Sequence, residues 1–364
     1  MFKLKSIPQP PSVKAPALTM SSPPHIKHPD NTRTLMLDVL IALTPAYVWG
    51  VYIFGLRALV LGVISVFSCV LFEAGAVFVL RRLNGGNARE WNPAPTILDL
   101  SAVVTGTLLA MNLPVSAPLW LPVIGSAFAI IVVKQLYGGI GKNIFNPALS
   151  AVVFLTLLFP AAMTNFTAPH TPISPLKITL SSADIVAAAP PLAALKQGVF
   201  PAESMFTLLI GDHAGTIGEV STLLLIAGGI YLLVRRVISW RIPVAFMGAV
   251  GLITIIFPKV ALASDVIALS FAMRQLTCGG LALGAIFMAT DYATSPVTPA
   301  GRLIYGVGCG IITVIIRYYG VYTDGVPFAI LIMNIFVWYL DRYAKPKYFG
   351  WTKPSKGAVQ TDDR

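Results

Sequence analysis

Long apolar runs separated by short polar turns dominate this sequence. A transmembrane helix needs roughly 17–25 mainly apolar residues to cross about 30 Å of hydrocarbon. Ten runs approach that length: Leu35–Leu56, Ala58–Leu80, Ile97–Leu113, Leu119–Leu136, Ile144–Phe159, Gly218–Val234, Ile242–Phe257, Leu276–Ala289, Leu303–Tyr319 and Val326–Leu340. The pattern predicts an all-α integral membrane protein with about ten transmembrane helices.

Several of these runs are too short to cross the hydrocarbon alone, among them Leu276–Ala289. Irregular backbone at membrane depth survives only where protein or a water-filled cavity surrounds it. We therefore expect broken or half-length helices inside the bundle, and Val260–Gln275 is a candidate for one such piece.

The polar stretch Ala161–Ile217 divides the runs into five before it and five after it. An odd number of spans in each half gives the halves opposite orientations, so related halves would form an inverted repeat. Residues Thr105–Pro114 align weakly with Leu283–Tyr292. We expect two inverted five-helix repeats, with boundaries at 1–34 (a basic, Pro-rich tail), 35–160, 161–217 (a loop), 218–343 and 344–364 (a second tail).

Composition supports a membrane protein, because 56% of residues are hydrophobic, 11% are charged and the mean hydropathy is +0.77. Soluble domains carry about 25% charged residues. The net charge of +11 raises nucleic-acid binding as an alternative. With the N-terminus placed inside, however, only four basic residues outside the spans fall on the outer side: Arg57, Lys177, Lys196 and Lys259. This distribution follows the positive-inside rule. The positive charge is therefore explained by membrane topology rather than by binding to nucleic acid.

The same distribution places both termini in the cytoplasm and the 161–217 loop outside. The first thirty residues have no apolar core, so they are typical of a cytoplasmic tail rather than a signal peptide. Cys69, Cys278 and Cys309 lie far apart in apolar runs. Their spacing suits no metal, cluster or disulfide, and we interpret them as small hydrophobic residues.

Ionisable groups at membrane depth cost about 2.5–3.5 kcal/mol on insertion scales and are usually functional or paired. The candidates in or near the spans are Asp38, Glu73, Asp99, Lys134, Arg274, Asp291, Arg317, Asp324 and Asp341. Most can also be explained as interfacial or helix-capping residues. Asp99 and Asp291 flank the two Gly-rich segments that correspond in the repeat, so they are the leading candidates for an ion path, and Asp324 is a further candidate.

The segment Asn143–Pro147 follows the glycine-rich Gly138–Gly141 and begins a predicted helix. Amide and carbonyl oxygens at a broken helix can replace the hydration shell of a cation. Asn143 and Asn146 are therefore candidates for the ion path, and a simple helix cap is the alternative.

The loop Gly211–Glu219 precedes the sixth span and is rich in glycine. Thr216 and Glu219 have capping-box spacing, with Thr216 as the N-cap. Exposed N–H groups at Gly215, Thr216, Gly218 and Glu219 would also suit a phosphate at a helix N-terminus. A cap without a ligand is the alternative.

Several motifs occur together and in order: Gly138–Ala148, Gly215–Glu219, Trp240–Pro243, Leu283–Asp291, Thr294–Pro296, Gly301–Arg302, Asp324–Gly325 and Met333–Asn334. In this combination the chain, from about His25 to Gly350, resembles the RnfD component of the Rnf ion-translocating electron-transport complex. That component is similar in turn to the NqrB component of the sodium-pumping NADH:quinone oxidoreductase. The resemblance implies a bacterial or archaeal cell-membrane protein that couples electron transfer between ferredoxin and NAD to Na⁺ or H⁺ translocation.

The resemblance also implies an FMN whose phosphate is esterified to a threonine in the outer loop. The corresponding stretch here is Asp184–Leu192, and the acceptor position is Pro190, which has no hydroxyl. Three alternatives follow. The first is a non-covalent flavin, either FMN or riboflavin, and the second is loss of the flavin. The third moves the bond to Thr179, Ser181 or Ser182.

No dinucleotide fingerprint follows a predicted strand, and the cysteine spacing suits no iron–sulfur cluster. The resemblance therefore assigns those functions to partner subunits that carry iron–sulfur clusters, an NAD site and a second flavin. The chain is then one subunit of an oxidoreductase complex and is not active alone. Two rival interpretations remain, namely a stand-alone channel or transporter for a small solute and a flavin-free scaffold subunit of the same complex.

Overall fold

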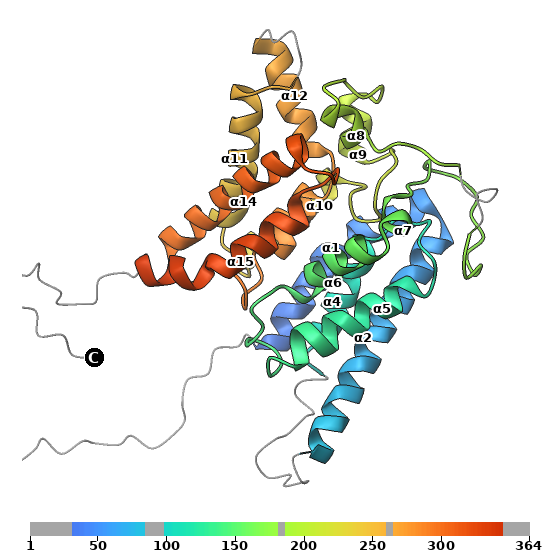
Figure 1. The fold of residues 1–364 in the computed structure, drawn as a ribbon, viewed down its shortest axis with the longest axis vertical. Helices are drawn as coiled ribbons and strands as arrows, with labels where there is room; N and C mark the ends of the chain where they lie inside the picture. The colour runs from blue at the N-terminus through green and yellow to red at the C-terminus, as the bar shows by residue number, and fades with distance from the viewer. Residues whose placement is uncertain (1–30, 84–97, 181–185, 260–264, 345–364) are drawn as a thin grey trace, which may run out of the picture. The chain divides into compact units, whose positions relative to one another are not determined.

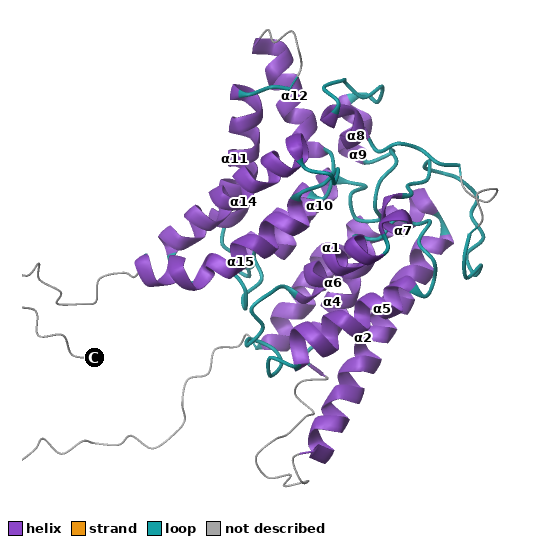
Figure 2. Cartoon of the chain, in the orientation of Figure 1, coloured by secondary structure: helices purple, strands orange, loops and turns teal. Residues whose placement is uncertain are grey.

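A computed structural model describes residues 31–83, 98–180, 186–259 and 265–344 of the chain. Within these ranges the secondary structure is helical, and the extended contacts are the isolated bridges Pro114–Thr216 and Thr167–Ala187 (Figure 2). The all-α prediction is therefore confirmed. Almost all of the two predicted tails, and Asp184 from the predicted flavin stretch, lie outside the described residues.

The first half contains five apolar segments, which Figure 1 shows side by side. They are α1 (Thr32–Phe54), α2 (Leu56–Leu83), α4 (Ser101–Met111), α5 (Leu121–Ala127) continuing as the π-helix η1 (Phe128–Gln135), and α6 (Pro147–Leu158). A long connection follows, with three short helices: α7 (Pro160–Thr164), α8 (Pro191–Lys196) and α9 (Met205–Ile210).

The second half also contains five apolar segments, one of which is broken. They are α10 (Thr222–Val234), α11 (Arg241–Ile256), α12 (Asp265–Thr277) with α13 (Leu281–Leu283) and the π-helix η3 (Gly284–Met288), α14 (Pro299–Tyr319) and α15 (Val326–Tyr343). Each predicted apolar run therefore overlaps a helix.

Four of the described helices, α1, α2, α14 and α15, are long and apolar enough to cross a membrane alone. The pair Ile267–Thr277 and Leu281–Met288 adds a fifth span if its two parts are counted together. The other five apolar helices are shorter, so the membrane-protein class is confirmed and the count of ten stays a prediction. Large side chains such as Phe67, which is 66% exposed, cover the outside of α2, as expected for a surface in lipid.

The predicted broken helix is present in the second half. The two parts of the pair meet at 64°, so Leu276–Ala289 and the described part of Val260–Gln275, which begins at Asp265, belong to one bent segment rather than to a separate piece and a span. Gly279 lies at the break with φ +78°, a left-handed conformation that glycine adopts without strain.

The two halves repeat one packing pattern. In the first half α2 packs against α4 and α5, and α5 packs against α6. In the second half α11 packs against α12 and α14, and α14 packs against α15. Across the halves, α1 contacts α10 and α6 contacts α15, so corresponding helices meet. This is the pattern expected of two inverted repeats, although the repeat itself stays a prediction.

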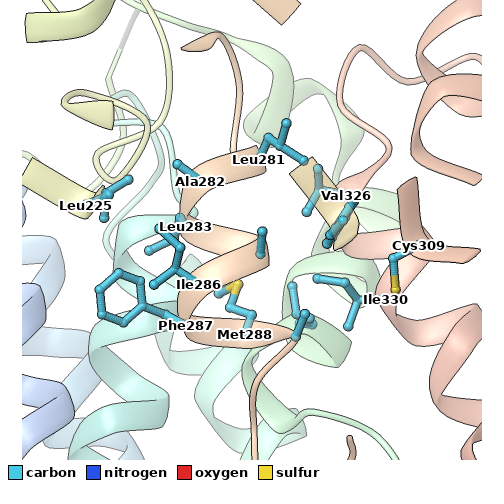
Figure 3. Close-up of a cluster of buried hydrophobic side chains, with 14 of the residues drawn as sticks. Leu225, Leu281, Ala282, Leu283, Ile286, Phe287, Met288, Cys309, Val326 and Ile330 are labelled. Atoms are coloured by element: carbon cyan, nitrogen blue, oxygen red, sulfur yellow. The ribbon is translucent and has the colours of Figure 1, made fainter. Parts of the chain in front are cut away.

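The main apolar core surrounds the broken helix (Figure 3). Leu281, Leu283 and Met288 of this segment are each no more than 1% exposed. Val326 and Ile330 of α15 face it from one side, and Leu225 of α10 belongs to the same cluster. The break is therefore held in place by packing from both neighbouring helices.

Candidate functional site

A cavity of about 310 Å³ brings together residues that are far apart in the sequence. Its lining includes Asn112 after α4, Pro190 before α8, Thr216 and Glu219 before α10, and Asp324 before α15. We call it the Pro190 cavity. Four of the residues singled out from the sequence thus share one site.

Lys196 of α8 links the segment that contains Pro190 to the loop before α15 in the wall of the cavity. Pro190 is the half-buried N-cap of α8, and Pro191 takes the first helical position, where its missing N–H is not needed. Lys196 Nζ, at the other end of α8, donates to the carbonyl oxygens of Gly320, Val321 and Tyr322 at 2.7–3.0 Å. Burial lowers the pKa of Lys196, and the charge of Lys259 acts in the same direction.

Two aromatic rings stand in the same wall. Tyr322 and Phe328 both line the cavity, and their centroids lie 4.8 Å apart at an interplanar angle of 17°. Stacked rings of this kind give a flat apolar surface on which another aromatic ring system can pack. These two residues were not identified from the sequence, since nothing in their spacing indicates a shared site.

A buried arginine supports the polar floor of the cavity. Arg317, 1% exposed, donates through Nη2 to Asp324 Oδ1 at 3.1 Å and through Nη1 to the Gln275 carbonyl at 2.7 Å. Asp324 Oδ2 also accepts from the Gly280 amide at 3.0 Å. The guanidinium thus neutralises Asp324 and ties α14 to the break of the bent helix.

Glu219 is the second carboxyl group of this floor and contacts no cation in the described part of the chain. Its Oε2 accepts from the Thr216 amide at 3.3 Å. A Cβ built on Gly280 would lie 3.0 Å from Asp324 Oδ2 and 3.9 Å from Glu219 Oε1, so both carboxyl groups converge there. The predicted run Gly218–Val234 included Glu219, but α10 begins at Thr222, so Glu219 lies in the loop before the helix. Burial, helped by the charge of Asp324, raises its pKa to about 7.

The predicted capping box at Thr216 is wrong in its main part. Helix α10 begins at Thr222, and Ser221 is its N-cap, with its hydroxyl accepting from the Leu224 amide. Thr216 instead forms a bridge with Pro114, and its buried hydroxyl adjoins the carboxyl group of Glu219. Of the two hydrogen bonds in a capping box, only the one from the Thr216 amide to the Glu219 carboxyl group is present.

Most amides of the predicted phosphate-binding turn are bonded within the protein, and the phosphate role stays a prediction. The amides of Ile217 and Gly218 donate to the carbonyl oxygens of Leu113 and Met111 after and within α4, at 3.1 and 2.6 Å. The amides of Thr216 and Glu219 are bonded within the loop. Because these donors are already used, the turn pins the loop to α4 and offers few free N–H groups to an anion.

A second cavity, of about 90 Å³, gathers three of the five predicted ion-path residues. Asn143, Asn146 and Asp291 line it together with Ser101 and Lys134. We call it the Asp291 cavity. Residues of α4 from Ser101 to Leu108 line this cavity, whereas Asn112, which follows the last turn of α4, lines the Pro190 cavity.

Asp99 and Asp324 stand apart from the Asp291 cavity. Asp99 does not line it but accepts from the Ser101 amide and hydroxyl at 2.8 and 2.5 Å, so it adjoins the cavity through Ser101. Asp324 lies in the Pro190 cavity instead. The structure thus separates one predicted ion-path residue from the others.

Asn146 has the capping role that the sequence left open. Its Oδ1 accepts from the amides of Ala148 and Leu149 at 3.0 and 3.3 Å, and Pro147 takes the first helical position of α6. Its Nδ2 also donates to the Met288 carbonyl at 3.2 Å. The cap is confirmed, and an ion-binding role stays a prediction.

Sequence analysis did not identify the pairing of Glu73 with Lys134. Lys134 lies in η1 and donates to Glu73 Oε1 of α2 at 2.5 Å, and both side chains are almost fully buried. The three cysteines are free and buried, in keeping with their interpretation as small hydrophobic residues. Among the described residues, no three His, Cys, Asp or Glu side chains form a group that could hold a metal ion.

These features define a multi-pass all-α membrane protein in which whole and broken helices enclose two cavities beside α4, each lined mainly by apolar side chains with a few polar and ionisable ones. Over residues 19–350 the chain matches the NQR2, RnfD, RnfE family, and it belongs to that family.

Curated relatives match along nearly their whole length. The chain is 44% identical over 345 residues to the RnfD-type component of the Na(+)-translocating ferredoxin:NAD(+) oxidoreductase complex of Acetobacterium woodii, covering 94% of this chain and 98% of the relative. It is 38% identical to the corresponding component of the ion-translocating oxidoreductase complex of Stutzerimonas stutzeri, over 89% and 94% of the two chains. It is 36% identical to the corresponding component of the proton-translocating ferredoxin:NAD(+) oxidoreductase complex of Clostridium ljungdahlii, over 93% and 98%.

Proposed function

We propose that this chain is the RnfD-type membrane component of an Rnf-type complex, which couples electron transfer between ferredoxin and NAD to translocation of Na⁺ or H⁺. Full-length similarity to components of such complexes supports this role. The chain would act only within the complex, beside subunits that carry iron–sulfur clusters, an NAD site and a second flavin. It would lie in the cell membrane with both termini in the cytoplasm.

We infer that the Pro190 cavity is the flavin site. The observation that carries this inference is the convergence of Pro190, Thr216 and Glu219 with the stacked Tyr322–Phe328 pair in one cavity. A flavin bound there would supply one- and two-electron transfer. The ring pair would pack against the isoalloxazine, and the Thr216 hydroxyl, which lines the same cavity, would supply a hydrogen bond to a polar edge of the ring.

The charges of the cavity determine which way the flavin would point. Arg317 neutralises Asp324, but Glu219 has no such partner among the described residues, so the floor carries a net negative charge when Glu219 is ionised. It then repels a phosphate and suits the neutral ring. The phosphate would therefore lie toward Pro190, where the family carries its ester. Since Pro190 has no nucleophilic oxygen, the flavin would be held without a covalent bond.

Flavin analysis of the complex purified with its partners tests this proposal. Native preparations of the wild type should contain a flavin attributable to this chain, and it should be released by denaturation. Tyr322→Ala and Phe328→Ala should reduce that flavin several-fold. Tyr319→Ala is the matched control, because Tyr319 is 81% exposed. Full flavin content in both cavity variants would rule out the Pro190 cavity as the site.

A flavin-free scaffold is the second candidate, and the missing hydroxyl at position 190 is the observation that favours it. The Pro190→Thr variant separates the two, when it is made with the family's flavin-attaching enzyme present. Fluorescence that survives denaturation in this variant, but not in the wild type, supports a retained flavin site. If the Pro190→Thr variant shows no flavin fluorescence and the native wild-type protein contains no flavin, the result supports a flavin-free scaffold subunit.

A further inference from the structure

An apolar groove lies between α10 and α11 in the second half of the chain. Its volume is about 790 Å³, and every residue that lines it is apolar or a glycine. Both helices pack against the π-helix η3, and Ile286 of η3 contributes to the lining. The broken helix thus forms the back of the groove, and α10 and α11 form its sides. We call it the α10–α11 groove.

The α10–α11 groove follows α11 over most of its length. Its lining runs from Pro243 to Ile256, which at about 1.5 Å per residue is about 20 Å. Two lining residues, Val244 and Leu252, are 57% and 59% exposed, so the groove opens onto the surface that faces lipid. One leaflet contributes about 15 Å of the hydrocarbon core. The groove is therefore long enough for one acyl chain of a lipid.

Positive charge gathers at one end of the groove. The hairpin that joins α10 to α11, residues 235–241, contains three arginines and no acidic residue. It lies between Leu233 and Pro243, which both line the groove. Arg235 Nη2 pairs with Asp38 Oδ2 of α1 at 3.0 Å. With Arg235 balanced by Asp38, the other two arginines give this end of the groove a positive charge.

Those two arginines are placed to bind a lipid phosphate. Arg236 is exposed, and Arg241 is half-buried with its guanidinium carbon 5.7 Å from the centroid of the Trp240 ring. Tryptophan is enriched at the membrane–water interface, and guanidinium groups bind phosphate through two parallel hydrogen bonds. The Tyr292 hydroxyl donates to the Val237 carbonyl and so holds the hairpin in place. The arginines therefore lie at headgroup level, next to a groove at the depth of the acyl chains.

We propose that the α10–α11 groove binds one anionic phospholipid, with its phosphate on Arg236 and Arg241 and one acyl chain along α11. The predicted topology places the hairpin on the cytoplasmic side, where basic pockets between transmembrane helices bind anionic headgroups. A transmembrane helix of a partner subunit would also match the apolar lining, but it would leave the arginines without an anion. The anionic lipid satisfies both parts of the site.

Lipid titration of the purified complex tests the charged part of the site. The complex is washed with detergent and titrated with dioleoyl phosphatidylglycerol, or with dioleoyl phosphatidylcholine, which has the same chains and no net charge. Native mass spectrometry counts the bound lipid. The wild type should retain one phosphatidylglycerol that phosphatidylcholine does not displace. The double variant Arg236→Gln, Arg241→Gln should bind it about 25-fold more weakly, since each basic residue contributes about fivefold beside an anionic lipid.

A matched arginine controls for surface charge in general. Arg342 at the end of α15 also lies beside a tryptophan, with its guanidinium carbon 5.5 Å from the centroid of the Trp338 ring, but it does not line the groove. Arg342→Gln should bind phosphatidylglycerol as the wild type does. Equal retention of the two lipids by the wild type, or the same loss in Arg342→Gln as in the double variant, overturns the proposal.

A second variant tests the acyl-chain part. A Cβ built on Gly248, which lines the groove, meets no atom within 4 Å, so Gly248→Leu fills the groove without displacing the backbone. This variant should assemble and lose the bound phosphatidylglycerol. Gly75→Leu in α2 is the control, because a Cβ there is equally unobstructed and Gly75 lies outside the groove. Unchanged lipid binding in Gly248→Leu contradicts the proposal, and loss of a protein subunit with an unchanged lipid count would assign the groove to a partner helix instead.

Discussion

Asn146 and Met288 meet between the two cavities, where Asn146 Nδ2 donates to the Met288 carbonyl at 3.2 Å. Asn146 lines the Asp291 cavity, and Met288 Sδ lies 3.8 Å from Nδ2 of Asn112, which lines the Pro190 cavity. The contact also joins the first half of the chain to the second. Two asparagines, Asn146 and Asn112, and one methionine, Met288, therefore connect the Asp291 cavity to the Pro190 cavity.

The first prediction concerns this contact. Asn146→Ala removes both the cap of α6 and the bond to Met288, whereas Asn146→Ser keeps a capping hydroxyl but is too short to reach Met288. Loss of a cap costs about 0.5–2 kcal/mol. Thermal unfolding of the purified complex should rank the wild type above Asn146→Ser, and Asn146→Ser above Asn146→Ala. Equal melting temperatures for all three would contradict the structural role given to Asn146.

The second prediction concerns pH. The pKa of Glu219 is raised from 4.5 to about 7, so the folded protein holds this proton more tightly than the unfolded chain does. Between about pH 4.5 and pH 7 the unfolded state loses the proton first, and stability should fall as pH rises. Above pH 7 the contribution is constant. Glu219→Gln should flatten this part of a melting-temperature profile, and a profile that keeps its slope would contradict the assignment.

The third prediction concerns ion movement. Asp291 lines the Asp291 cavity and Asp99 adjoins it through Ser101. Asp291→Asn and Asp99→Asn remove charge while preserving shape, so each should reduce redox-driven ion uptake into vesicles several-fold, while the complex still assembles. Uptake at the wild-type level with both residues changed would place the path elsewhere.

The fourth prediction concerns topology. The distribution of Lys and Arg places both termini in the cytoplasm and the loop before α10 outside. A reporter active only in the cytoplasm should work when fused at Lys356 and fail at Pro175. The reverse pattern would invert the orientation and would place the Pro190 cavity on the cytoplasmic side.

The sequence by itself determined the helical class and the positions of the helices, because apolar segments of this length have few alternatives in lipid. The ten predicted runs overlap the described helices, and Asn146 before Pro147 gave a correct cap, since both signals are local. The capping box at Thr216 failed for the same reason: its spacing is local, but hydrogen bonds from the loop to Met111 and Leu113 hold it in another conformation.

Only the tertiary structure decided which residues share a site. Pro190, Thr216, Glu219 and Asp324 come from three separate segments, and they share a cavity because α8, α10 and α15 each pack against the bent segment formed by α12, α13 and η3. The same holds for Glu73 and Lys134, which are 61 residues apart and meet because α2 packs against η1. The sequence gives the chemistry of each side chain. Which side chains lie close together depends on how helices distant in the sequence pack, and no local sequence pattern predicts that packing.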